Sequence, residues 1–299
     1  MRKTLIGVGA LVALTCLPHN AFAWGSVGHR LIMRRAIDLL PPQIKPFFER
    51  FRDELVVRVI DPDQWRVIGW EENPNHFVDF GVSEYGKFPF KELPREYGAA
   101  LEKFGDATLK RYGLLPWREA EMFGNLVRAF EGFSRDQPYT VTNVVLFSAV
   151  ASHYLQDAHQ PLHATVNYDG ADTGNHGIHA RFERDLIERF EPRLRLNPAA
   201  PTAMTNPRDA SFAVLLESYQ LVDMLLEADR DAVAGKDTYD DEYFERFFVG
   251  VQPILERRLS ESISATAGLI VGAWDQAGKP KVSIQEARPI QKVRAPRGR

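Results

Sequence analysis

The chain has 299 residues, of which 44% are hydrophobic and 26% charged, a composition typical of a globular protein rather than a disordered or fibrous one. A formal net charge of −3 excludes the strong general attraction to nucleic acid or anionic membranes that a basic protein shows. The length allows one large domain or two small ones, with ample material for a buried core.

The first 23 residues have the pattern of an export signal. Two basic residues precede an apolar run over 4–17, and Ala-Phe-Ala at 21–23 is the small-x-small pattern that a signal peptidase cuts. The run is too short for a membrane-spanning helix, and no later stretch is long enough to be one. We therefore predict a secreted or periplasmic protein that begins at Trp24 and loses its only cysteine, Cys16. The new α-amino group at Trp24 could bind metal once it is deprotonated.

Apolar residues at helical spacing predict helices in the first half of the chain, and no segment shows the alternation of a β-hairpin. The first helix would carry His29 at the start of a buried stripe that runs to Leu40 and ends at two prolines. Residues 61–79 are rich in proline and acidic residues, which predicts irregular backbone of the kind that often carries ligands. Three further helices are expected over 47–60, 99–111 and 116–133.

Helices separated by loops are also expected in the second half of the chain. Loops are expected over 167–177 and 197–208, where Gly, Asp, Asn or Pro are frequent. Helices are expected over 142–159, from 178 onward, over 210–233 and over 239–277, the last broken near Pro253. The fold class that follows is all-α, with one multi-helix domain over 24–277. From Gly278 to residue 299 the chain is polar and basic, which predicts a disordered tail that is either solubilising or able to touch phosphate polyanions.

One window, residues 152–183, concentrates the histidines. His153 and Asp157 are four residues apart, and so are His179 and Glu183, which on a helix places both members of each pair on one face. Imidazole and carboxylate without sulfur suit zinc or another borderline divalent metal. A solvated polar face is the alternative, but such faces favour Lys, Glu and Arg. Five of the eight histidines fall here: His153, His159, His163, His176 and His179.

Five fragments occur in an order that resembles the zinc-dependent phospholipase C / S1–P1 nuclease superfamily. They are WGSVGH, PDQWR, NHFVDF, HYLQDAHQPLH and GIHARFE. The resemblance covers Trp24 to about Phe190 by motif, and the remaining helices fit in helical character alone. It implies an all-α domain of the phospholipase C/P1 nuclease type with three zinc ions in one cleft.

The resemblance also implies nine ligating residues in three groups. The first zinc would be held by Asp63, His76, His153 and Asp157. The second would be held by the amino nitrogen and carbonyl oxygen of Trp24, by His29, and by Asp157 as a bridge. The third would be held by His163, His179 and Glu183.

Some roles within this set stay open or are assigned by exclusion. Asp61 lies two residues before Asp63 in the same segment, and the resemblance favours Asp63 as the ligand. His159 and His176 have no ligand counterpart and are expected behind the ligands or at the solvent. Two zinc ions bridged by Asp157 could share a water and lower its pKa enough to give hydroxide near neutral pH. A second oxygen of Asp63 could orient or deprotonate that water, which makes Asp63 and Asp157 the expected catalytic residues.

The motifs divide between two classes of phosphodiester substrate. WGSVGH and QPLH resemble the nuclease branch, whereas HARFE, HYL-x-D and the cysteine-free core resemble the phospholipase branch. Phe77 and Asp79 are the expected substrate neighbours in either case. We expect a phospholipase C-like hydrolase acting on phospholipid, with a nuclease that releases 5′-nucleotides from single-stranded nucleic acid as the alternative. A secreted zinc-binding protein without catalysis is a third interpretation, and no obligate protein partner is indicated.

Overall fold

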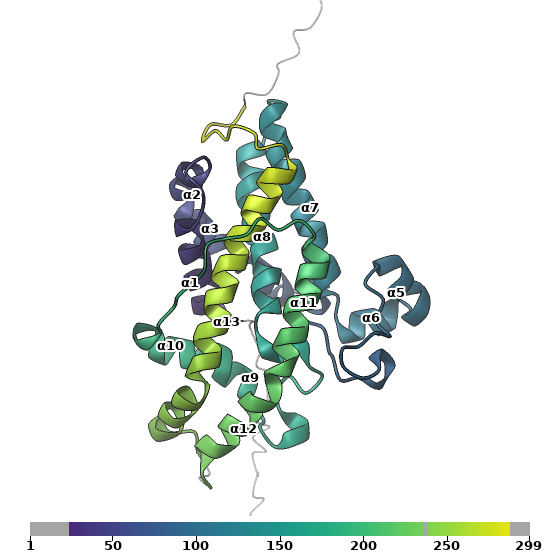
Figure 1. Cartoon of the computed structure of the whole chain (residues 1–299), viewed down its shortest axis with the longest axis vertical. Helices are drawn as coiled ribbons and strands as arrows, with labels where there is room; N and C mark the ends of the chain where they lie inside the picture. Colours follow the sequence, from purple (N-terminus) through teal and green to yellow (C-terminus); the bar gives the residue numbers. More distant parts are fainter. Residues whose placement is uncertain (1–23, 236–237, 288–299) are drawn as a thin grey trace, which may run out of the picture.

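The computed structural model describes residues 24–235 and 238–287. Every regular element in those ranges is helical and none is a strand, which confirms the all-α prediction, and the helices form a single body (Figure 1). None of the described helices is both long and apolar enough to cross a membrane. The predicted signal peptide over 1–23 lies outside the described residues, as do residues 288–299 of the predicted tail.

The α-helices differ widely in length. In chain order they are α1 (Gly25–Asp38), α2 (Lys45–Arg50), α3 (Arg52–Arg58), α4 (Asp61–Val67), α5 (Tyr97–Phe104), α6 (Asp106–Tyr112), α7 (Leu115–Ser134), α8 (Thr140–Ala158), α9 (Ile178–Ala180), α10 (Leu186–Phe190), α11 (Pro207–Gln220), α12 (Val222–Val233) and α13 (Asp241–Gln276). The short turns that matter for the site are η1 (Asn73–His76), η3 (Pro161–Ala164) and the π-helical turn η5 (Arg181–Asp185).

Helix α8 lies at the centre of this body. It pairs with α7 and also packs against α1, α3, α11 and α13 (Figure 1). Every residue over 148–158 is buried, because neighbouring helices cover α8 on all sides at this end. His153 and Asp157 therefore lie within the protein interior.

Two clusters of buried apolar side chains meet beside the same end of α8. The larger cluster fills the space between α1, α3, α7, α8 and α13 and contains Tyr154 and Leu162. The smaller one gathers residues 78–93 with parts of α5, α6 and α11, and contains Val78 and Ala164. Since Leu162 and Ala164 belong to different clusters, the turn between them lies on the border. This border is where the histidine window falls.

Several helix boundaries differ from the prediction. The helix expected over 47–60 is two helices, α2 and α3, which meet at Phe51. The helix expected over 99–111 is interrupted at Gly105, which adopts a φ of 77° that continues no right-handed helix. The helix expected over 210–233 is divided at Leu221 into α11 and α12.

Two further predictions about backbone are wrong. Residues 61–67 form helix α4 rather than irregular backbone, because Pro62 stands in its first turn, where the missing N–H is not needed. Helix α13 is not broken at Pro253 but runs through it. Pro253 is exposed, and so is Val249 four residues earlier, whose carbonyl loses its helical partner and can bond to water.

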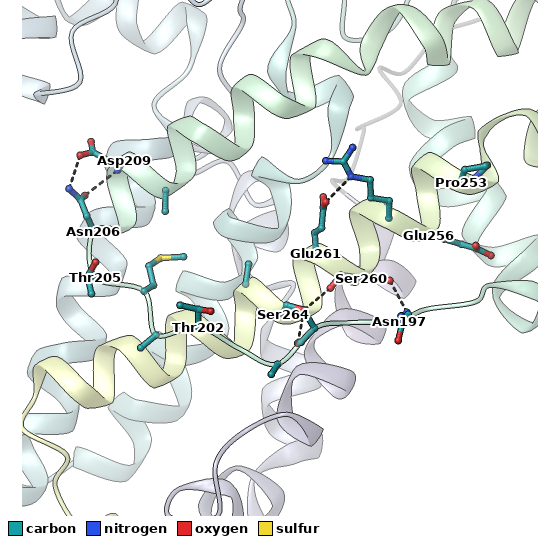
Figure 2. Close-up of a pocket in the computed structure, with 17 residues that line it drawn as sticks. Asn197, Thr202, Thr205, Asn206, Asp209, Pro253, Glu256, Ser260, Glu261 and Ser264 are labelled. Carbon is teal, nitrogen blue, oxygen red and sulfur yellow. Dashed lines mark hydrogen bonds and ion pairs between the residues drawn. The ribbon is translucent and has the colours of Figure 1, made fainter.

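Residues 194–206 cross α13 as an extended segment, in agreement with the predicted loop (Figure 2). Met204 donates its backbone N–H to the carbonyl of Gly268 over 3.0 Å. A Cβ atom on Gly268 or Gly272 would overlap the carbonyl oxygen of Thr202 or Met204, so these glycines allow the close approach. A shallow groove lies beside the segment, and none of the described residues that line it belongs to the predicted site.

The start of the predicted tail packs on the helical body. Trp274 donates its indole N–H to the carbonyl of Pro280 over 2.9 Å. Glu286 accepts hydrogen bonds from the backbone N–H groups of Val141 and Thr142, at 3.2 and 2.8 Å, at the N-terminus of α8. The prediction of disorder from Gly278 onward did not anticipate these contacts. A carboxylate at this position also interacts favourably with the helix dipole.

Glu119 of α7 is a buried carboxyl group away from the histidine window. Its side chain is fully buried, and the hydroxyl of Ser211 on α11 donates to it over 3.0 Å. Burial raises the pKa of Glu119 to about 8, and the Ser211 hydrogen bond offsets part of that effect. The folded protein therefore keeps a proton on Glu119 at pH values where the unfolded chain has lost it.

We predict that Glu119→Gln flattens the pH dependence of stability. Between the ordinary pKa of 4.5 and about 8 the folded state binds the extra proton, so the free energy of unfolding falls as pH rises through this window. The contribution of Glu119 approaches about 1.4 kcal/mol per pH unit. Urea unfolding of both proteins from pH 4 to 9 would measure it. Parallel curves for the wild type and the variant would contradict the prediction.

Candidate metal centre

Eight side chains that sequence analysis named come together in three buried groups. The polar ligand atoms within each group all lie within 4.8 Å of one another. The groups are His29, His153 and Asp157; Asp63, His76 and His153; and His163, His179 and Glu183. Because His153 belongs to the first two groups, these are contiguous. The expectation of buried His and carboxylate clusters able to hold metal ions is confirmed at this level.

The N-terminal motif contacts α8 through Trp24 and packs closely against its other neighbours at Gly28. Trp24 precedes α1 with a left-handed φ of 46°, and its indole N–H donates to the carbonyl of Gln156 on α8 over 2.6 Å. A Cβ atom on Gly28 would lie 3.0 Å from both Ile187 and Trp24, so a larger residue would push α1 outward. Gly28 thus lets α1 pack closely against Ile187 of α10.

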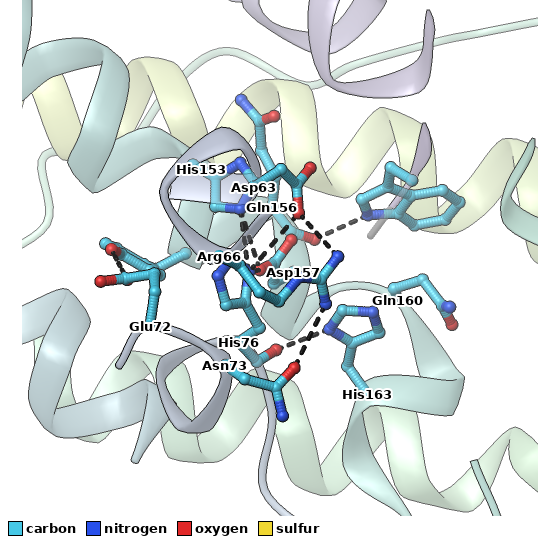
Figure 3. Close-up of polar contacts among 12 residues, drawn as sticks. Asp63, Arg66, Glu72, Asn73, His76, His153, Gln156, Asp157, Gln160 and His163 are labelled. Carbon is cyan, nitrogen blue, oxygen red and sulfur yellow. Dashed lines mark hydrogen bonds and ion pairs between the residues drawn. The ribbon is translucent and has the colours of Figure 1, made fainter. Parts of the chain in front are cut away.

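Asp157 is the centre of the first two groups. Its Oδ2 lies 3.0 Å from Nδ1 of His76 and 3.3 Å from Nε2 of His153, and its Oδ1 lies 3.3 Å from Nε2 of His29. Figure 3 shows Asp63, His76, His153 and Asp157 converging from α4, η1 and α8. Ligands about 2.0–2.1 Å from a tetrahedral zinc ion stand about 3.3 Å apart. The observed spacings agree with that requirement.

Several polar atoms of these residues have unmet bonding capacity. Nε2 of His29 and Oδ1 of Asp157 lie close together, yet neither makes a hydrogen bond to any described residue. The same holds in the described ranges for Oδ2 of Asp63 and Nε2 of His76. A buried polar atom without a partner costs about 1–3 kcal/mol. Coordination to a divalent cation would give these atoms the bonding partner that they lack.

Partners on the far side of three imidazoles set which nitrogen faces the groups. Nδ1 of His153 lies 2.8 Å from the carbonyl of Val59, and Nδ1 of His163 lies 2.6 Å from the carbonyl of His76. A carbonyl can only accept, so Nδ1 carries a proton, and Nε2 is the nitrogen left to bind a cation. Nδ1 of His29 has a side-chain partner instead, Oε1 of Gln156, at 2.7 Å.

The structure places Asp63 rather than Asp61 in the cluster. Asp63 is fully buried, and its Oδ1 lies 3.9 Å from Nδ1 of His76 and 3.3 Å from the guanidinium of Arg66. Asp61 is partly exposed and pairs with Arg58 at 3.4 Å. Two residues on a helix project to nearly opposite sides, so helix α4 can direct only one of these acids inward.

The third group lies where η3 meets α9 and the π-helical turn η5. Nε2 of His179 is 3.1 Å from Nε2 of His163 and 2.9 Å from Oε2 of Glu183. Gln160, which is fully buried, donates its amide to the same Glu183 oxygen over 2.9 Å. His179 and Glu183 keep their i,i+4 relation, and π-helical turns of this kind occur frequently at functional sites.

Arg181 fixes the turn that carries the third group. It lies between His179 and Glu183 in sequence, points away from them, and binds both carboxylate oxygens of Asp229 on α12 at 2.9 and 3.1 Å. Tyr243 of α13 contacts both members of this pair. One guanidinium nitrogen, Nη2, makes both contacts, and the Tyr243 hydroxyl links the two side chains, so α12 and α13 hold the turn in place.

The histidines of each group lower the pKa of the carboxyl group beside them. Burial alone would raise the pKa of Asp157, but His153, His29 and His76 hold it well below its usual value. Burial is likewise outweighed at Glu183, where His179 and His163 lower the pKa to about 2. Both acids are therefore ionised at neutral pH, which is the form that binds a divalent cation.

Phe77 and Asp79 lie beside the groups rather than in them. Both side chains are partly exposed and follow His76 in the chain. Burial raises the pKa of Asp79 to about 7, and the nearby charge of His163 opposes that rise. A Cβ on Gly113 would overlap the carbonyl of Phe77, so this glycine lets the segment pack closely. The predicted substrate neighbours are thus next to the clusters.

Of the remaining residues that sequence analysis discussed, two are buried and one is exposed. Trp24 is buried, and its carbonyl oxygen accepts a 3.1 Å hydrogen bond from the N–H of Gly28. His159 is buried at the C-terminal end of α8, where burial and the charge of Arg258 lower its pKa to about 3. His176 is exposed, as a residue facing solvent was expected to be.

Sequence reasoning missed Gln156, Gln160 and Arg66 as members of the site. Gln156 and Gln160 are both fully buried, and the only signal in the sequence was their position among the predicted ligands of the histidine window. Arg66 lies between Asp63 and Asn73, at 3.3 and 3.4 Å (Figure 3). Its signal was a cation placed one helical turn after a predicted acid ligand.

No protein-family model matches the chain, and no curated protein matches it in sequence. The geometry of the three groups and the sequence motifs are therefore the features that point to a function.

We predict that divalent metal raises the melting temperature of the protein and that Asp157→Asn removes most of the effect. Binding to the folded state stabilises by about 2.7 kcal/mol at 100 times the dissociation constant, which corresponds to about 5–10 °C for a domain of this size. Calorimetry of chelated and zinc-loaded protein would measure this. Asp61→Asn is the matched control and should keep the shift. An unchanged melting temperature in the wild type would contradict the prediction.

Proposed function

We propose that the chain is a zinc-dependent phosphodiester hydrolase of the phospholipase C / S1–P1 nuclease type, exported from the cell and trimmed to begin at Trp24. The observation that carries this proposal is the fully buried Asp157, which reaches His29 with one oxygen and His76 and His153 with the other. A carboxylate that faces two adjacent ligand groups is the arrangement a bridged metal pair requires. A closed structural zinc site does not require a carboxylate that faces two ligand groups.

The donor set fits three divalent ions in type as well as in number. The first two groups, which share His153, supply three imidazoles and two carboxylates, and the third supplies two imidazoles and a carboxylate. The main-chain atoms of Trp24 would complete the ligands around His29. Nitrogen and oxygen donors without sulfur suit zinc, although manganese or iron could also bind them.

The chain's own groups have distinct tasks in such a hydrolysis. Bound metal ions would supply an acidic water and positive charge opposite the phosphoryl oxygens. Asp63 keeps Oδ2 without a hydrogen bond to any residue in the described ranges, so this oxygen can orient the attacking water and accept its proton. The third group would lie against the phosphate and balance the charge that develops on it.

A phospholipid is the substrate we favour. HARFE, HYL-x-D and the lack of cysteine over 24–299 support the phospholipase branch. The alternative, hydrolysis of single-stranded nucleic acid, is favoured by a specific observation: Phe77 is partly exposed with Asp79 two residues away, a pairing able to stack on a base and hydrogen-bond to it. A zinc-binding protein without catalysis accounts less well for the unpaired oxygen of Asp63.

The experiment offers both substrates side by side to zinc-loaded protein that begins at Trp24. Phosphatidylcholine vesicles should yield diacylglycerol, and Asp157→Asn should abolish the product. Release of 5′-nucleotides from single-stranded DNA or RNA would reverse the choice of substrate. Neither product from fully loaded protein would leave the non-catalytic interpretation standing and contradict the proposed enzyme.

A second variant separates catalysis from metal binding. We expect Asp63→Asn to lower kcat by about 10²–10⁴-fold, the usual range for a lost general base. Metal content measured on the same sample shows whether the loss reflects chemistry or an empty ligand position. Full activity at full metal occupancy would contradict the role of Asp63 as base, and Asp61→Asn serves again as the control.

A further inference from the structure

Gln156 contacts the N-terminal segment through both its side chain and its backbone. Its Oε1 lies 2.7 Å from Nδ1 of His29, and its backbone carbonyl accepts the indole N–H of Trp24 over 2.6 Å. Its amide nitrogen donates to the hydroxyl of Thr266 on α13 over 3.4 Å. Gln156 is fully buried and directly precedes Asp157, so all these contacts converge on one turn of α8.

The orientation of this amide decides which nitrogen of His29 carries the proton. With Oε1 facing Nδ1, the imidazole donates from Nδ1, and Nε2 keeps its lone pair. That Nε2 lies 3.3 Å from Oδ1 of Asp157 and makes no hydrogen bond within the described part of the chain. The opposite tautomer would direct an N–H from Nε2 toward Asp157 and remove the lone pair that a cation needs.

No backbone carbonyl takes this role at His29, in contrast to His153 and His163, which donate to Val59 and His76. A side-chain amide can be replaced by mutation, whereas a main-chain carbonyl cannot. The contact at His29 is therefore the one orienting hydrogen bond among these three that substitution can test directly.

We propose that Gln156 is a positioning residue that fixes His29 as a metal ligand and attaches the mature N-terminus to the bridging Asp157. The proposal rests on the metal centre described above, but it does not depend on which phosphodiester is cleaved. Partners of this kind set ligand orientation, and their loss weakens metal binding by about 10–100-fold. The expected effect is confined to the ion that His29 would ligate.

Two substitutions of similar size have opposite expected outcomes. Gln156→Met keeps the length of the side chain but accepts no hydrogen bond from an imidazole of this geometry, so His29 loses its orienting partner. Gln156→Glu keeps an acceptor at the same position and should preserve metal binding. The backbone carbonyl that receives the Trp24 indole is present in both variants. Thr266→Val is the matched control, because it removes the other polar contact of Gln156 and leaves His29 untouched.

The readout is metal binding to the protein that begins at Trp24, measured by equilibrium dialysis against zinc together with the visible absorption of the cobalt-substituted form. We expect the wild type, Gln156→Glu and Thr266→Val to bind the same number of ions. Gln156→Met should bind one of them about 10–100-fold more weakly, with loss of the corresponding part of the cobalt spectrum. Circular dichroism of the chelated proteins controls for folding.

Three results would overturn the proposal in distinguishable ways. Equal affinity of Gln156→Met and wild type would show that the contact does not orient the ligand. Equal weakening in Gln156→Met, Gln156→Glu and Thr266→Val would show that packing around Gln156 matters and its acceptor does not. Absence of metal binding by the wild type would overturn the proposed metal centre together with this inference.

Discussion

The structure depends on the burial of one carboxylate, that of Asp157, deep inside a helical body. A buried carboxylate without a partner is strongly destabilising in a medium of low dielectric constant, so the groups around it must supply positive charge. Here three imidazoles come within 3.3 Å of its two oxygens. Their attraction keeps the pKa of Asp157 well below its usual value in spite of complete burial. A divalent cation within the same cluster would strengthen that stabilisation further.

Several features of the fold follow from this constraint. Helix α8 must be covered on every side at its C-terminal end, and α1, α3, α7, α11 and α13 provide the cover. The N-terminal motif must lie against α8, where the indole N–H of Trp24 donates to the carbonyl of Gln156. The turn that holds His179 and Glu183 must be rigid, and the Arg181–Asp229 pair supplies rigidity from a different part of the chain. Elements far apart in sequence are thus held against one short region.

What could be predicted from sequence is what depends on neighbours in the chain. The i,i+4 pairs, His153 with Asp157 and His179 with Glu183, were visible because helical geometry fixes their relation. The choice of helix over strand was visible for the same reason. Spacing alone could not show that His29, Asp63 and His76 would join them, and only the resemblance to a known superfamily brought these residues into the set.

The errors of prediction also have physical causes. Residues 61–67 form a helix because proline is favoured in a first turn, a rule that competes with its usual role as a helix breaker. Pro253 is tolerated because the carbonyl it leaves unpaired lies on an exposed side. Gln156 was missed because its partner His29 is 127 residues away, and no local pattern reveals such a contact.

Crystallography with anomalous scattering tests most directly whether these three groups are metal sites. Crystals of the chain from Trp24 onward, grown with zinc and measured on both sides of the zinc absorption edge, should show three anomalous peaks. Two should flank Asp157, and the third should lie among His163, His179 and Glu183, each about 2.0–2.2 Å from its ligand atoms. No peak beside Asp157 in zinc-saturated crystals would contradict the account.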